Sequence, residues 1–175
     1  MASSTDNVKL GVCTVLFDEI DLGYTKGGVE VEVQTTTHEV KVDQMGETPI
    51  NELITGRTVS VKVPLAETTL DNLVAIMPGA TLITDGTDPT KKKVVVKTGV
   101  STSLLASAKK LTLRPKGTTG ADDFTVFKAN CPGALNFAYK LDDERVFMAN
   151  FKGYASADAG GDGDLFSVGD NTAAA

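Results

Sequence analysis

The most constraining feature of this chain is the alternation of apolar and polar residues between Val29 and Asp43. Residues 29–34 alternate valine with Glu or Gln, and residues 39–43 alternate in the opposite phase. A period of two residues is typical of a β-strand with one buried and one solvated face. The composition favours the same structure, because Val, Ile and Thr supply 46 of the 175 residues and β-branched side chains favour strands. We therefore expect a mainly β protein.

The two alternating segments predict an antiparallel hairpin with its turn at residues 35–38, which leaves His38 as an exposed turn residue. Pairing Val33 with Val40 puts every valine of both segments on one face. The other face then carries six polar side chains, namely Glu30, Glu32, Gln34, Glu39, Lys41 and Asp43. In a monomer, such a face is simply the solvated side of the sheet.

The segment between this hairpin and the next strand is expected not to be a strand. Thr48 and Pro49 form a helix-start signal, residues 50–54 allow about one helical turn, and Gly56 suits its end. The strand at 57–65 should point its valines and Leu65 inward, with Thr58, Ser60 and Lys62 outward. Further strands are expected at 8–17, 80–84, 93–98, 110–114, 123–129, 136–141 and 145–154, and a short one at 165–168.

One helix is expected over residues 68–77. Its apolar residues share one face at helical spacing, and they are Leu70, Leu73, Val74 and Met77. Pro78 and Gly79 end it. The fold expected from these elements is a β-sandwich with one short flanking helix.

Charge and motif content exclude several functional classes. The chain has 17 basic and 23 acidic residues, a balance that argues against gripping nucleic acid through its phosphates. No apolar run approaches the length of a membrane span, and the first residues do not resemble a signal peptide. Cys13 and Cys131 are expected to be buried free thiols. Because the sequence lacks a nucleophile–base motif, a metal cluster and a phosphate loop, we expect no enzyme, cofactor or metal.

Two charged segments allow more than one interpretation. Lys91–Lys93 form either a solvated loop or a contact with an acidic patch of a neighbouring subunit. Residues 158–164 form a flexible acidic segment or a segment that docks on a neighbouring subunit. A calcium-binding repeat is a weaker alternative, because the Gly-Asp pattern occurs in a single copy. We expect one β-sandwich domain over residues 1–155, followed by an acidic Gly/Ala-rich segment over 156–175.

A longer pattern carries a family resemblance. The segments 27–33, 43–50, 53–57, 59–67 and 70–73 occur in this order and together resemble the tail tube (major tail) proteins of long-tailed, non-contractile bacteriophages. The resemblance covers about residues 20–77. Baseplate and distal-tail ring proteins share the same core, so they remain an alternative. A free β-sandwich that decorates a surface or acts in adhesion is another.

The resemblance implies that six copies form a ring and that rings stack into a hollow tube lined by a barrel of strands from all subunits. It implies a virion tail protein, assembled in the host cytoplasm. Its partners would be itself, a tape-measure protein, tail terminator and distal-tail or baseplate proteins, and double-stranded DNA that passes without specific binding. The residues expected to line the lumen are Glu30, Glu32, Gln34, Glu39, Lys41, Asp43, Thr58, Ser60 and Lys62. The loop expected to contact the next ring comprises Gln44, Met45, Gly46, Glu47, Thr48, Pro49 and Ile50.

Elementary geometry fits this expectation. A backbone ring wide enough for a DNA duplex, very roughly 35–50 Å across, needs on the order of 17–25 strands at about 4.8 Å spacing and about 40° tilt. Six chains can supply about four strands each. Four carboxylates against Lys41 would also give the polar face of the 29–43 hairpin a net charge of −3, which repels phosphates.

Overall fold

The computed structural model describes residues 11–133, 136–156 and 163–173. The strands are β1 (Cys13–Phe17), β2 (Ile20–Asp21), β3 (Glu30–Val40), β4 (Asn51–Leu65), β5 (Ala80–Thr84), β6 (Lys92–Val96), β7 (Lys109–Pro115), β8 (Phe124–Asn130), β9 (Phe147–Tyr154) and β10 (Phe166–Val168). One α-helix, α1 (Leu70–Ile76), and a 3-10 turn, η2 (Asp43–Met45), complete the described elements. The expectation of a mainly β fold with one short helix is confirmed.

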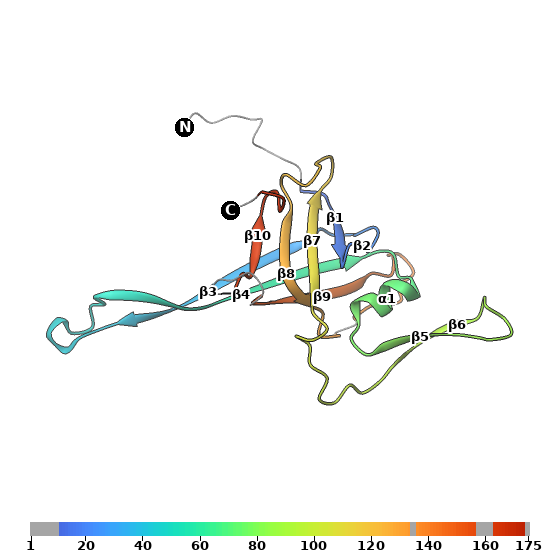
Figure 1. Ribbon diagram of the computed structural model, residues 1–175, viewed down its shortest axis with the longest axis horizontal. Helices are drawn as coiled ribbons and strands as arrows, with labels where there is room; N and C mark the ends of the chain where they lie inside the picture. The colour runs from blue at the N-terminus through green and yellow to red at the C-terminus, as the bar shows by residue number, and fades with distance from the viewer. Residues whose placement is uncertain (1–10, 134–135, 157–162, 174–175) are drawn as a thin grey trace.

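The main sheet is antiparallel, with the strand order β2-β1-β7-β8-β9-β4-β3. Its two halves form two layers, because β1, β7 and β8 run across the direction of β3, β4 and β9 (Figure 1). The sheet turns from one layer to the other at β8, where residues 128–130 pair with β9 and residues 124–126 pair with β10. This near-orthogonal packing makes a sandwich from a single folded sheet.

The core lies between the two layers. β4 contributes Val59, Val61, Val63 and Leu65, as its alternation predicts. The facing layer contributes Val15, Phe17, Leu111, Leu113 and Val126. The rings of Phe17 and Phe151 lie 5.1 Å apart between centroids and join the layers.

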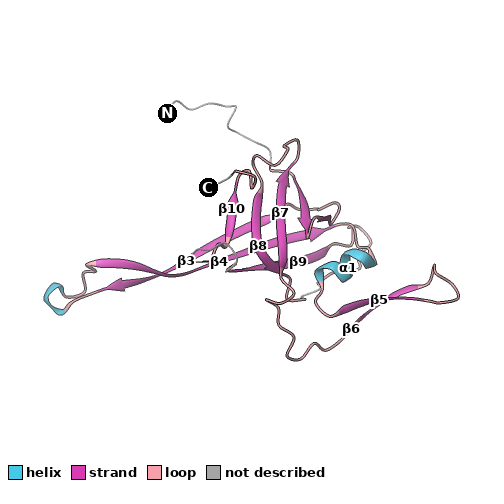
Figure 2. Cartoon of the chain, viewed as in Figure 1, coloured by secondary structure: helices cyan, strands magenta, loops and turns pink. Residues whose placement is uncertain are grey.

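The predicted hairpin between residues 29 and 43 is wrong. β3 continues without a turn through Val40, and its partner along its whole length is β4. The expected turn region holds three threonines in a row and none of the Gly, Asn or Pro that a tight turn favours, so the chain stays extended there. The true turn lies at residues 41–50 (Figure 2).

The predicted helical turn at residues 50–54 is also wrong, because β4 begins at Asn51. Residues 51–54 pair with Val40 to Thr37 of β3, and one extra residue, Thr55, makes a bulge before Gly56 pairs with Thr36. A long strand partner supplies more hydrogen bonds than one isolated helical turn, and it overrides the local capping signal.

The remaining strand predictions divide by position. The strands at 80–84, 93–98, 110–114, 123–129, 145–154 and 165–168 are confirmed within a few residues at their ends. The predicted strand at 136–141 is wrong. Its aromatic residues Phe137 and Tyr139 instead gather with Phe147 around the Arg145 guanidinium, 5.4 to 5.9 Å from each ring centre. The predicted first strand begins at residues that lie outside the described ranges. Most of the acidic segment 158–164 also lies outside them.

The helix α1 begins where the sequence predicts. Thr69 is its N-cap, and its side chain accepts a hydrogen bond from the backbone N–H of Asn72. The Asn72 side-chain amide in turn donates to the carbonyl of Leu22, which ties the helix to the segment after β2. The strands β5 and β6 follow as a separate two-stranded ribbon beside α1 (Figure 1).

Candidate assembly surface

One polar face spans three neighbouring strands. In the β3–β4 pair, Glu30 lies opposite Lys62, Glu32 opposite Ser60 and Gln34 opposite Thr58. The Lys62 Nζ lies 3.2 Å from a carboxylate oxygen of Glu30, and the Gln34 amide donates to Glu32 over 2.6 Å. Six of the nine residues expected on the lumen side therefore share one face.

β9 extends this face. Lys152 lies opposite Ser60 and Asn150 opposite Lys62. The polar face thus carries two Glu and two Lys, a balanced charge in place of the expected net −3. Sequence reasoning did not include Lys152 or Asn150 in this face, although the alternation of polar residues in 146–152 was the signal that could have found them.

The other three expected residues lie elsewhere. Because β3 does not turn at residue 35, Glu39 lies on the same face of the strand as Val31 and Val33. Glu30 lies on the other face. Lys41 and Asp43 follow the end of β3, where the Lys41 ammonium lies 3.1 Å from Glu47 and 3.4 Å from Glu39. The wrong hairpin explains why six residues were grouped as one face.

The β3–β4 pair extends far beyond the sandwich. β9 supports β4 only from Ser60 onward. Beyond the pair Thr36–Gly56, the two strands form a narrow ribbon that projects from the body (Figure 1). We call residues 36–56 the arm. Every residue of the arm except Val40 and Val42, which are half-buried, is exposed.

The loop expected to contact a neighbouring ring forms the end of the arm. Gln44 and Met45 belong to η2, and the backbone N–H of Ile50 donates to the carbonyl of Val40 to close the loop. Gly46 has a φ of 61°, which a glycine adopts without strain. Glu47, Thr48 and Pro49 follow, also exposed.

Apolar side chains along the arm face solvent. Met45 is 61% exposed and Ile54 is 58% exposed, and Ile50 and Leu53 are similar. Nearer the body, Val31 and Val33 are each about 40% exposed. Exposed apolar side chains gathered on one projecting element are typical of a contact site for another chain.

The helix buries a different residue from those expected at its packing face. Ile76 is its buried side chain, 4% exposed, whereas Leu70 is 39% exposed. Leu73, Val74 and Met77 are half-buried.

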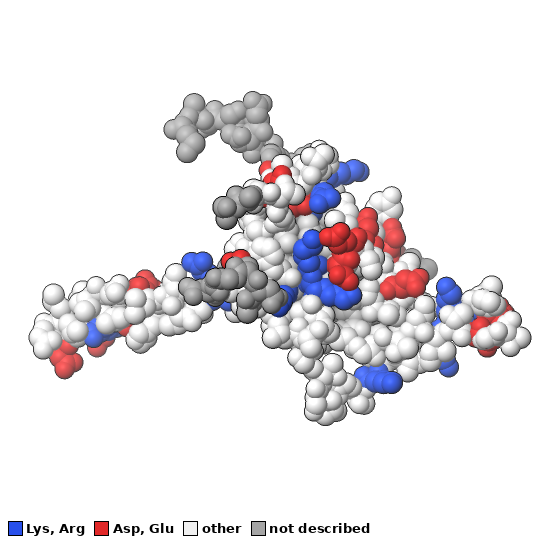
Figure 3. All heavy atoms as spheres, viewed as in Figure 1, with Lys and Arg blue, Asp and Glu red and all other residues white. Residues whose placement is uncertain are grey.

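The ribbon that contains Lys91–Lys93 projects from the body on the side opposite the arm (Figure 1). We call residues 79–97 the β5–β6 ribbon. It is closed at its base by a hydrogen bond from the Lys97 N–H to the Gly79 carbonyl. Figure 3 shows acidic side chains near the end of the arm and basic side chains at the end of the molecule where the ribbon projects.

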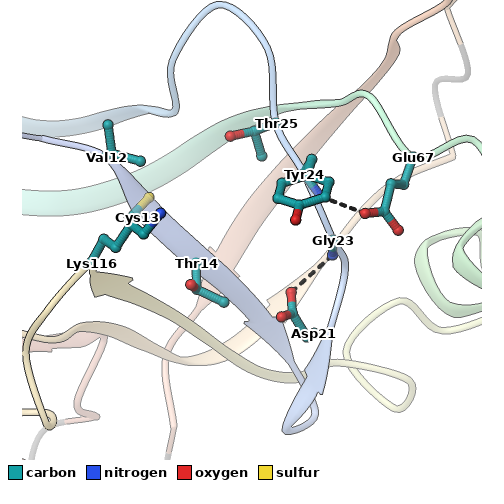
Figure 4. A pocket seen from close by; sticks show the side chains of 9 residues that line it. All are labelled: Val12, Cys13, Thr14, Asp21, Gly23, Tyr24, Thr25, Glu67 and Lys116. Atoms are coloured by element: carbon teal, nitrogen blue, oxygen red, sulfur yellow. Dashed lines mark hydrogen bonds between the residues drawn. The ribbon is translucent and has the colours of Figure 1, made fainter.

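A shallow hollow lies between β1 and the segment after β2, lined by Cys13, Asp21, Gly23, Tyr24 and Glu67 among others (Figure 4). Its carboxylates bind backbone: Asp21 accepts from the Gly23 N–H at 2.9 Å and Glu67 from the Tyr24 N–H at 3.2 Å. Burial raises the pKa of the Cys13 thiol, which keeps it protonated and unreactive. These contacts hold the backbone in place after β2, which is a structural role.

Other groups with a shifted pKa form ion pairs that connect segments of the sandwich. Hydrogen bonds to Asp143 and Glu144 raise the pKa of Lys26 to about 12 and tie the segment before β3 to the loop before β9. A two-oxygen contact with Asp123 raises the pKa of the Arg114 guanidinium. Both Cys13 and Cys131 are free thiols, Cys131 fully buried and Cys13 half-buried.

The described residues 11–133, 136–156 and 163–173 contain no group of three or more His, Cys, Asp or Glu side chains placed to hold a metal ion. No helix in the described part of the chain has the length and apolar character of a membrane span. No protein-family model matches this chain, and no curated protein matches it either.

Proposed function

We propose that this protein is a structural subunit that assembles with copies of itself into hexameric rings, and that the rings stack into a hollow phage tail tube that conducts the viral genome. The observation that carries the proposal is the arm, which holds exposed apolar side chains far from the core. The resemblance of residues 20–77 to tail tube proteins supports it.

The arm is a poor structure for a monomer. A two-stranded ribbon in water is marginally stable, because each strand has only one partner and the apolar side chains stay hydrated. The outer edge of β3 also has no partner strand among the described residues, and an open edge of eleven residues is a template for pairing with another chain. Burial against neighbouring subunits removes both disadvantages.

The polar face supports the conduit part of the proposal. It is continuous over β3, β4 and β9 and is balanced in charge, so it neither holds phosphates strongly nor collapses into an apolar contact. The opposite face of β4 is core. A tube wall requires a sheet with one buried face and one solvent-exposed face.

Replacing residues 37–55 by Asn-Gly tests the proposal. The new turn connects Thr36 to Gly56, which already lie opposite each other, and Asn-Gly favours a tight hairpin. We expect the variant to keep the strand-rich far-UV spectrum and the melting temperature of the body. We expect it to stay monomeric in sedimentation velocity at concentrations where the unmodified chain associates.

A milder variant separates the apolar contact from the length of the arm. L53S/I54S keeps the arm and removes two exposed apolar side chains, and V100S removes one from a loop outside it as a matched control. The double variant should weaken association while V100S leaves it unchanged. Association of the armless chain at the level of the unmodified protein would contradict the proposal.

A further inference from the structure

The end of the arm carries an acidic and apolar face. Glu39 of β3 lies directly opposite Glu52 of β4, with the pair Thr37–Ile54 next to it on the same face. Like charges opposite each other in a strand pair are destabilising. Within the described residues, Lys41 is the one cation in an ion pair with either carboxylate, and it is shared with Glu47. Over residues 36–56 four carboxylates face this one lysine, a net charge of −3.

The β5–β6 ribbon carries the complementary face. Lys93 lies opposite Ile83, and the pair Thr81–Val95 follows on the same side, which is exposed. The other side holds the half-buried Leu82 and Val94. Over residues 79–97 four lysines face two aspartates, a net charge of +2.

The lysines of the ribbon are mostly unused inside the molecule. Lys91 lies 3.4 Å from Asp88, whereas Lys92, Lys93 and Lys97 form no ion pair with any described residue. Asp85 accepts hydrogen bonds from the backbone N–H groups of Asp88 and Thr87, and Asp88 accepts from the hydroxyl and the backbone N–H of Thr90. These hydrogen bonds lower the pKa of both carboxyls and occupy them locally. A shallow depression at this end is lined by Ile83, Asp85, Thr90 and Lys91–Lys93.

We propose that the arm of one copy docks on the β5–β6 ribbon of the next copy, with Glu39 and Glu52 against Lys93 and with Ile54 against Ile83 and Val95. Lys92 lies opposite Thr84 on the other side of the ribbon and adds positive charge at the same end. This inference rests on the proposed self-assembly and names the surface that receives the arm. The two surfaces lie at opposite ends of the molecule (Figure 1), so they cannot meet within one chain. Two different surfaces in contact make a head-to-tail interface, and such an interface propagates into a ring when its rotation closes and into a stack when it does not.

Both surfaces combine opposite charge with exposed apolar side chains, which is the composition of a specific contact. The charges set the orientation, since an arm facing another arm brings carboxylates together. The apolar side chains supply the area removed from water.

Charge reversal with rescue tests the pairing. We expect K92E/K93E and E39K/E52K each to raise the concentration needed for assembly by at least about tenfold, measured by sedimentation velocity, because each brings like charges together. We expect the quadruple variant, which restores opposite charges with reversed sign, to recover assembly. All four side chains are exposed, so the melting temperature should stay within a few degrees of the unmodified chain. K116E, in the loop after β7, is the control.

The outcomes distinguish the two proposals. If the unmodified chain stays monomeric at every concentration, both self-assembly and docking are wrong. If it assembles and K92E/K93E has no effect, or if the quadruple variant does not recover, the docking is wrong and self-assembly stands. Only recovery of assembly by the quadruple variant supports the pairing, because the losses caused by two unrelated charge reversals would add rather than cancel.

Discussion

Gly153 shows how closely the two layers approach each other. A Cβ atom at this position would lie 2.2 Å from Cγ1 of Val59 and 2.9 Å from Cγ1 of Val126. Gly153 belongs to β9, next to Ala129 of β8, at the point where the sheet turns from one layer to the other. A glycine here lets the valines of both layers pack over the strand.

We expect Gly153→Ala to lower the free energy of unfolding by about 1–3 kcal/mol, because the added methyl group overpacks the core. Gly56→Ala is the matched control, since Gly56 is also in a strand and a methyl group there would meet no atom of a non-adjacent residue within 4 Å. It should change stability by less than about 0.5 kcal/mol. Denaturant melts of both variants measure the difference, and equal effects would mean that the layers are not packed as described.

At the level of single residues, alternation predicted the faces of a strand where no turn was assumed within it. In β4 the inward set from Val59 to Leu65 followed directly from the sequence. In β3 the same reasoning misplaced Glu39, because a turn was assumed at 35–38 and a turn reverses the face that a given parity occupies. The sequence carries the period, but the register depends on a partner strand that is distant in sequence.

Among the elements, α1 has one end fixed by local sequence and one face fixed by the tertiary structure. Its end near Pro78 is predicted from the sequence, whereas the Thr69 cap is found in the structure. Its buried residue, Ile76, is outside the predicted apolar stripe, because the helix has only seven residues and touches the sandwich mainly through its last turn.

We expect Ile76→Ala to cost about 2–5 kcal/mol, since it removes a buried side chain and leaves a cavity. Leu70→Ala, at a position 39% exposed on the same helix, should cost less than about 1 kcal/mol. Thermal or denaturant melts give both values. A larger loss for Leu70 than for Ile76 would place the packing face of the helix on its first turn.

The arm was the element least predictable from sequence. Residues 44–56 contain a genuine capping signal at Thr48 and Pro49, yet the strand partner supplied by residues 36–40 determines the structure of residues 51–56. The sequence predicts Leu53 and Ile54 in a helical turn, because apolar residues beside a capping signal favour a helix start, although in the structure both side chains are exposed on a strand.

For the whole molecule, the sandwich, the arm and the β5–β6 ribbon have separate tasks in this account. The sandwich holds the core, and in the proposed assembly the polar face of β3, β4 and β9 would form the channel wall while the two projections would join neighbouring copies. A monomer leaves both projections hydrated, so assembly is where their apolar and charged side chains gain contacts.

The most direct test of this account is electron microscopy of the purified chain at high concentration and near-physiological salt. We expect hollow rings of six subunits and stacks of such rings, with Glu30, Glu32 and Lys62 on the inner surface in a reconstruction. Micrographs that contain only compact monomers would contradict the account, as would a tube whose inner surface is formed by other residues.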